Sequence, residues 1–240
     1  MKAIDLIGHV GHRIHIARGR EARMLFSWLG DLRGKSLLDV GGGDGYWAAI
    51  ARRRGAAAFS IDLDPKRTER GLRFTHRPVL LRGDALRLPF AEASFDAVMS
   101  ISSIEHFASS EAAIAEMARV LKPHGDLVLS ADSLAGRDRW PHLAAAHVRR
   151  YAVTAPLDHH LLDEQLVVAG LEPVRSAYLF KSAWSNRLYL ELSRHRLAWN
   201  VAAPLSPLVA ISDRRIGSGS GSIVLIHGRR QPAQEPFVSR

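Results

Sequence analysis

The 240-residue chain contains no cysteine. Disulfide bonds and cysteine-ligated zinc are therefore excluded, and the composition fits a reducing compartment. No apolar run approaches the roughly 18 residues that a membrane-spanning helix needs. The first 20 residues are interrupted by charge and histidine, unlike a secretory signal. We therefore expect a cytoplasmic protein.

Hydrophobic residues make up 47% of the chain, and no internal repeat is visible. A chain of this length and composition can bury the core of one large domain. Apolar runs of strand length alternate with segments of helical pattern. The expected strands lie within residues 35–40, 56–62, 78–85, 95–102, 126–132, 172–180 and 221–229. The expected helices include residues 46–54, 111–121 and 157–170, and one that begins at Pro65.

This alternation predicts an α/β fold, a Rossmann-like, doubly wound and mostly parallel seven-stranded sheet with helices on both faces. We expect an N-terminal helical extension over residues 1–35 and a flexible tail over 231–240. The domain between them, 36–230, divides into a ligand-binding half (36–132) and a substrate-side half (133–230). Residues 183–214 form an insertion before the last strand.

The net charge of +9 is unevenly distributed along the chain. Residues 171–240 carry ten basic and four acidic side chains, whereas residues 36–170 are close to neutral. A basic surface can meet nucleic acid, anionic lipid or an acidic substrate, or it can simply be solvated. No nucleic-acid-binding signature is present, so we expect no nucleic-acid partner. The sequence does not indicate an oligomeric state.

The stretch "LLDVGGGDGYWA", residues 37–48, places a glycine-rich turn between a strand and a helix. Such a turn lets a ligand approach the backbone closely. A dinucleotide is one candidate, since Gly43 opens a G-x-G-x-x-A pattern and Asp62 follows at the distance of a ribose-binding acid. S-adenosylmethionine is the other. In a parallel sheet both would bind at the carboxyl ends of the strands, where Asp84 and residues 100–106 also fall.

Five ordered segments resemble the class I S-adenosylmethionine-dependent methyltransferases, specifically the type 11 group. They are "LLDVGGGDG", "SIDLDP", "RGDALRLPFAEASFDAV", "SSIEHF" and "RVLKPHGDLVLS". The resemblance covers about residues 36–132 and implies S-adenosylmethionine as cofactor. It assigns cofactor contacts to Asp39 (the methionine ammonium), Gly41, Gly43 and Gly45 (close backbone), Asp62 (ribose), Leu63 (adenine packing), Asp84 and Ala85 (adenine edge), and Ser100.

The sequence departs from the family pattern at two positions. Gly42 stands where the family often has cysteine, and His124 replaces a glycine in the "KPHG" turn. Histidine tolerates a positive φ better than most residues, so we expect His124 to have a structural role in that turn.

Proton transfer, where the acceptor needs it, points to "SISSIEHF" at the end of the fourth strand. His106 titrates near neutral pH and is a candidate general base or orienting residue, with Glu105 beside it. Related quinone-pathway O-methyltransferases carry an acid where this chain has Ser102. Two ligands and a hydroxyl make a poor metal site, so we expect no metal. His159 and His160 are weaker candidates for substrate contact.

The resemblance implies methyl transfer to an O, N or C atom of a small-molecule or lipid-like acceptor. Two alternatives stay open, a nicotinamide-dependent oxidoreductase and a non-catalytic cofactor-binding module. The insertion 183–214 is the candidate for acceptor specificity, as a lid, as a peripheral membrane contact or by plain packing. Helical spacing there predicts a stripe of Trp184, Leu188, Leu192 and Trp199.

Overall fold

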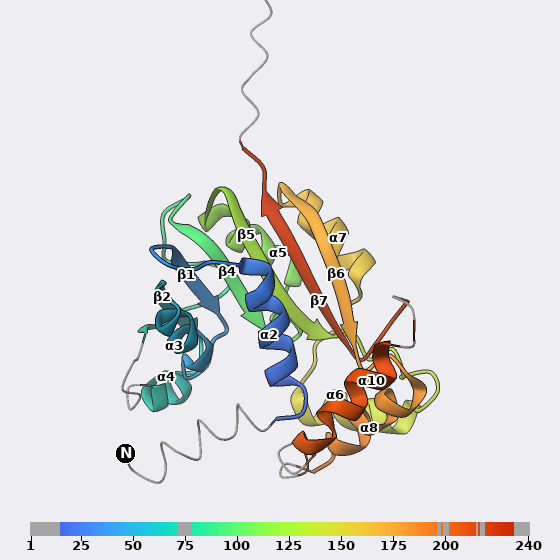
Figure 1. Cartoon of the computed structure of the whole chain (residues 1–240). Coiled ribbons are helices and arrows are strands. Elements are labelled where there is room, and N and C mark those ends of the chain that lie inside the picture. The colour runs from blue at the N-terminus through green and yellow to red at the C-terminus, as the bar shows by residue number, and fades with distance from the viewer. Residues whose placement is uncertain are drawn as a thin grey trace, which may run out of the picture.

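The computed structural model describes residues 15–71, 78–195, 198, 202–214, 216 and 219–232. Its centre is a seven-stranded sheet in the order β3-β2-β1-β4-β5-β7-β6 (Figure 1). Strand β7 pairs antiparallel with both of its neighbours, and the other pairings are parallel. The predicted Rossmann-like fold is therefore confirmed.

The strands are β1 (Ser36–Val40), β2 (Ala57–Asp62), β3 (Val79–Arg82), β4 (Phe95–Ile101), β5 (Leu121–Asp132), β6 (Leu171–Leu179) and β7 (Ile223–Arg230). The helices are α2 (Arg18–Leu29), α3 (Tyr46–Arg53), α4 (Pro65–Gly71), α5 (Ser110–Val120), α6 (Pro141–Tyr151), α7 (His159–Val168), α8 (Ala183–Leu192) and α10 (Ser206–Arg214), with 3₁₀ turns η1 (Ile104–His106) and η2 (Ala203–Leu205). No helix in this described part of the chain is long and apolar enough to cross a membrane.

Helix starts follow the capping signals of the sequence. The Asp158 side chain accepts a hydrogen bond from the Leu161 amide at 2.9 Å and begins α7, and Ser109 caps α5 in the same way. Strand β5 differs from expectation because it begins at Leu121, before the predicted residue 126. Leu121 pairs with Phe95, and an irregularity in the register accommodates the turn in which His124 has a φ of 63°, as its position predicted.

Helices cover both faces of the sheet. Helices α2 and α3 pack on one face, and α5 and α7 pack on the other (Figure 1). Of the predicted N-terminal extension, the described residues 15–35 are part of the main core, because Leu25 and Leu29 of α2 are buried there. Helices α6, α8 and α10 gather at one end of the sheet (Figure 1).

Helix α8 turns a polar face toward the protein. Its buried residues are Ser185, Asn186, Tyr189 and Leu190. Of the stripe expected from helical spacing, Leu188 and Leu192 pack against the core, Trp184 is 48% exposed and Trp199 lies outside the described residues. Apolar spacing missed the buried face because its polar side chains are held by hydrogen bonds, such as that from Ser185 Oγ to Asp213 at 3.0 Å.

Candidate functional site

The loop after β1 lies directly on the neighbouring strand ends. Gly41 has a φ of 69°, its amide donates to the Ile61 carbonyl at 2.9 Å, and its carbonyl accepts from Ser103 Oγ at 2.9 Å. A Cβ atom at Gly41 would lie 2.7 Å from the Ser103 Cβ. Glycine is required here by the protein's own packing as well as by the backbone conformation.

Gly43 is the position where the loop backbone is open. Its amide donates to Asp62 Oδ2 at 2.9 Å, and its φ is 59°. A Cβ atom there would meet nothing nearer than the Arg67 Cδ, at 3.8 Å. The side-chain space that Gly43 leaves can therefore admit a ligand against the backbone.

Acidic and apolar groups continue along the same edge. The other Asp62 oxygen accepts from the Asp64 amide at 2.9 Å, and Leu63, between them, is 64% exposed. The Gly83 amide donates to the Asp62 carbonyl at 3.1 Å and so brings Asp84 to this edge. Asp84 Oδ1 accepts from the Leu86 amide at 3.0 Å, and the intervening Ala85 is 8% exposed. A leucine this exposed next to a nearly buried carboxylate provides an apolar surface beside an acceptor.

Asp39 lies beneath the loop and is 1% exposed. Burial, with additional repulsion from Asp44 and Asp62, raises the pKa of its carboxyl to about 8, and the Ala48 amide offsets only part of this. No polar atom of the described residues, the Ala48 amide included, meets full hydrogen-bond geometry with either carboxylate oxygen. A Cβ atom at Gly42 would lie 2.5 Å from Asp39 Oδ2, so glycine at this position leaves the space that the carboxyl occupies.

Two other predicted residues are inside the protein. Ser100 in β4 is fully buried, and its hydroxyl has no hydrogen-bond partner among the described residues. Glu105 is 2% exposed, and its Oε1 accepts from the Asp132 amide at 3.2 Å. Burial and the neighbouring Asp132 raise the pKa of Glu105 well above its ordinary value. Burial therefore favours the protonated form of Glu105.

His106 lies at the surface of the edge. Its side chain is exposed to solvent, and Nδ1 lies 3.3 Å from the Ala152 carbonyl oxygen. Enough protein still surrounds the ring for desolvation to lower its pKa. A lowered pKa leaves the imidazole neutral at pH 7, which is the form that accepts a proton. His159 stands apart from this group, with its Nδ1 2.9 Å from the Tyr178 hydroxyl.

A buried polar network at the end of β5 was not predicted from the sequence. Asp132 lies 2.7 Å from His147 Nε2 of α6 and accepts a hydrogen bond from the Tyr189 hydroxyl of α8. These hydrogen bonds outweigh burial and lower the pKa of Asp132. The surroundings therefore favour the ionised form of Asp132 and the protonated form of Glu105. The only sequence signal for this network is the position of Asp132 at the end of the fifth strand.

A second unpredicted residue explains the position of Ser102. Glu21 of α2 is 1% exposed. Its Oε2 accepts from Ser102 Oγ at 2.5 Å and from Ser130 Oγ at 2.8 Å. The Ser102 hydroxyl is thus engaged with α2. Among the described residues no group of three His, Cys, Asp or Glu side chains is arranged to hold a metal ion.

Removing the Tyr189 hydroxyl should destabilise the fold. In Tyr189→Phe one oxygen of buried Asp132 loses its donor, which we expect to lower the free energy of unfolding by about 1–3 kcal/mol. Urea unfolding followed by circular dichroism measures this. Tyr151→Phe is the control, because its hydroxyl donates to a neutral carbonyl of Ser193 at 3.2 Å. An equal loss in both variants would contradict a special role for the charged acceptor.

Known proteins match the part of the chain that contains the glycine loop and the neighbouring strand ends. Residues 38–129 match the family described as "Methyltransferase domain". An uncharacterized methyltransferase of Mycobacterium tuberculosis is 39% identical over 99 residues, which is 40% of this chain and 39% of that protein. The match thus spans about two fifths of the relative's length.

Solved structures share the fold over a longer range. Geranyl diphosphate C-methyltransferase from Streptomyces coelicolor, solved with Mg²⁺, geranyl diphosphate and S-adenosyl-L-homocysteine, has a TM-score of 0.66 at 18% identity, covering 89% of this chain and 77% of that one. The [4+2]-cyclase SpnF has a TM-score of 0.63 at 23% identity, covering 90% and 81%. At these identities the likeness concerns the fold. The family match therefore concerns residues 38–129, which lie within a Rossmann-like sheet that runs from Ser36 to Arg230.

Proposed function

We propose that the protein binds S-adenosylmethionine at the edge formed by the glycine loop and the end of β2, and transfers its methyl group to an acceptor. The observation that carries the proposal is the arrangement of Gly43, Asp62 and Leu63. An open backbone position, a carboxylate bonded to the Gly43 amide at 2.9 Å and a leucine that is 64% exposed stand side by side. The carboxylate suits the ribose hydroxyls of an adenosine, and the exposed leucine suits its flat base.

The residues present fit this cofactor. Asp62 retains acceptor capacity for the ribose hydroxyls, since each of its oxygens accepts one amide. Leu63 would pack on the adenine, and Asp84 would accept from its amino group. The buried Asp39 carboxyl, which lacks a partner among the described residues, would meet the methionine ammonium. When bound, the cofactor supplies an activated methyl group, so the protein needs mainly to align the acceptor and exclude water.

His106 is the group at this edge that can take a proton from an acceptor. It is exposed, and its lowered pKa keeps it neutral at pH 7. Glu105, buried beneath it, has no route to the acceptor and acts through the Asp132 network. We therefore assign His106 as the base for acceptors that ionise on methylation and Glu105 as a positioning residue.

The acceptor is a small or lipid-like molecule methylated on O, N or C. The insertion 183–214 is its candidate lid, because Tyr189 of α8 is bonded to Asp132 at the end of β5, beside the edge. Trp184 on the same helix is half exposed and is the apolar side chain that this lid would offer to the acceptor.

Calorimetry with S-adenosylmethionine, S-adenosylhomocysteine and NAD tests cofactor choice. We expect binding of the first two and none of NAD, and the reverse would favour an oxidoreductase. Single-turnover transfer of a labelled methyl group to a cell or lipid extract tests catalysis. Tight cofactor binding without any labelled product would favour a non-catalytic module.

Methyl transfer should survive chelation. Ser102 is engaged with Glu21, and the described residues hold no metal-binding group of three His, Cys, Asp or Glu side chains, so turnover in EDTA should equal turnover in buffer. Addition of Mg²⁺ to the chelated and dialysed protein is the matched measurement. Loss of turnover in EDTA with recovery in Mg²⁺ would show that Glu105 and His106 act as ligands.

A further inference from the structure

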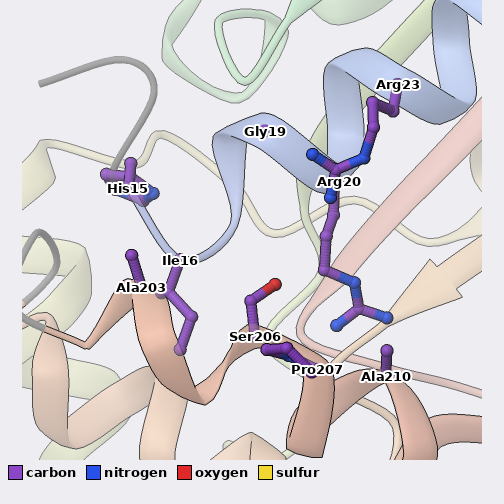
Figure 2. A pocket seen from close by; sticks show the side chains of 9 residues that line it. All are labelled: His15, Ile16, Gly19, Arg20, Arg23, Ala203, Ser206, Pro207 and Ala210. Carbon is purple, nitrogen blue, oxygen red and sulfur yellow. The ribbon is translucent and has the colours of Figure 1, made fainter. Parts of the chain in front are cut away.

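A pocket of about 330 Å³ lies between the start of α2 and the segment formed by η2 and α10. Figure 2 shows the Arg20 side chain reaching from α2 toward α10, with the Ser206 hydroxyl on the opposite wall. His15, Arg20 and Arg23 line the α2 side. No acidic side chain of the described residues lines it. The pocket thus has a basic wall that faces a hydroxyl.

The charge of Arg20 is incompletely satisfied. Its side chain is 13% exposed, and its Nη2 lies 3.2 Å from Asp213 Oδ2. Its Nη1 is buried and has no hydrogen-bond partner among the described residues. The same Asp213 carboxylate also accepts from the Phe180 and Lys181 amides, each at 2.9 Å. One edge of a desolvated guanidinium therefore lacks an acceptor, which is costly unless an anion supplies one.

The neighbouring bases reinforce the positive potential. Arg23 lies three residues after Arg20 on the pocket side of α2, is exposed and forms no ion pair within the described ranges. Burial, with repulsion from Arg23 and Arg214, lowers the pKa of Arg20. His15 Nδ1 accepts from the Ala17 and Arg18 amides at 3.2 and 3.3 Å.

This pocket is separate from the cofactor edge. Arg18 and Glu21, on the opposite flank of α2, bond to the Ile101 carbonyl at 3.0 Å and to Ser102 at 2.5 Å at the strand ends. The width of one helix, about 10 Å, therefore separates the pocket from the strand ends.

We propose that the pocket between α2 and α10 binds a phosphate group, either of a soluble phosphate ester or of a lipid headgroup. Two guanidinium groups and a hydroxyl offer donors in several directions to an anion with several oxygens. Leu208 and Ile211 of α10 are 55% and 51% exposed next to pocket residues Pro207 and Ala210, where a lipid's acyl chains would lie.

Titration of the full-length protein with inorganic diphosphate tests the soluble source, and sedimentation with phosphatidic acid or pure phosphatidylcholine vesicles tests the headgroup. We expect saturable binding of diphosphate, of phosphatidic acid vesicles, or of both. Arg23→Glu should weaken it at least about 10-fold by placing a like charge beside the anion. Arg53→Glu, the same charge change at an exposed arginine in the last turn of α3, should not.

Diphosphate binding would identify a soluble ligand, and binding to phosphatidic acid vesicles alone would identify a headgroup. Absence of both, equal binding to the two kinds of vesicle, or equal losses in the two variants would overturn the proposal. Circular dichroism spectra and urea unfolding midpoints, unchanged in both variants, show that the fold is intact. Because diphosphate is titrated without cofactor, failure of the cofactor proposal would leave this test readable.

Discussion

Asp62→Ala is expected to weaken S-adenosylmethionine binding by about 10²-fold or more. The variant loses two charge-assisted hydrogen bonds to the ribose, each worth roughly 1.5–3 kcal/mol. It also releases the Gly43 amide, which Asp62 holds at 2.9 Å, so the loop loses part of its support. Calorimetric titration of the variant against the parent measures the loss.

Asp64→Asn is the matched control for that measurement. It removes the same charge two residues along the chain and keeps an oxygen to accept from the Lys66 amide, as Asp64 does at 2.9 Å. We expect its cofactor affinity to stay within about 3-fold of the parent, because screened charge at the surface contributes little. If folded Asp62→Ala bound the cofactor like the parent, the site would be misplaced.

Cofactor binding at pH 6.5 should release about one proton from Asp39. The buried carboxyl has a pKa of about 8 in the free protein and is therefore protonated at this pH. A bound ammonium favours the ionised form and lowers that pKa. Affinity should then rise by up to about 10-fold per pH unit between pH 6 and pH 8 and level off above. Calorimetry in two buffers of different ionisation enthalpy counts the released proton.

The Asp39→Asn variant tests whether the released proton comes from Asp39 or from another group. It should bind the cofactor more weakly and release no proton, since the amide cannot ionise. His106 does not confuse the result, because its lowered pKa leaves it largely neutral at the start. The same observed enthalpy in both buffers for the parent protein would refute an ionising Asp39.

The free protein offers a second readout of the same carboxyl. Its folded pKa lies above the ordinary value of 3.8. Between about pH 4 and pH 8 the unfolded chain therefore binds fewer protons than the folded one, and the contribution of Asp39 to stability falls as pH rises. Asp39→Asn should remove this slope, so the stability difference between variant and parent should grow toward pH 8.

The sheet could be predicted because its strands are short apolar runs that end in recognisable residues. Asp39 and Asp62 each close or nearly close such a run, and the structure places both beside the glycine loop. Local pattern is sufficient for these positions, since parallel strands bring their carboxyl ends to one edge.

The buried network could not be predicted in this way. Asp132, His147 and Tyr189 come from three different elements, and Glu21 meets Ser130 of β5 from α2, so these contacts arise only once the elements pack. His147 has no metal-ligand spacing and occupies a helix of ordinary composition. The basic pocket escaped prediction for the same reason, because α2 and α10 are separated by most of the sequence.

The position of β7 has a consequence for synthesis of the chain. Residues 223–230 are synthesised after both of their partners, and they pair with β5 on one side and β6 on the other. Until then both earlier strands have an unpaired backbone edge, which other nascent chains can join. A chain released a few residues short of β7 would keep both edges open, so premature termination there would produce an aggregation-prone product.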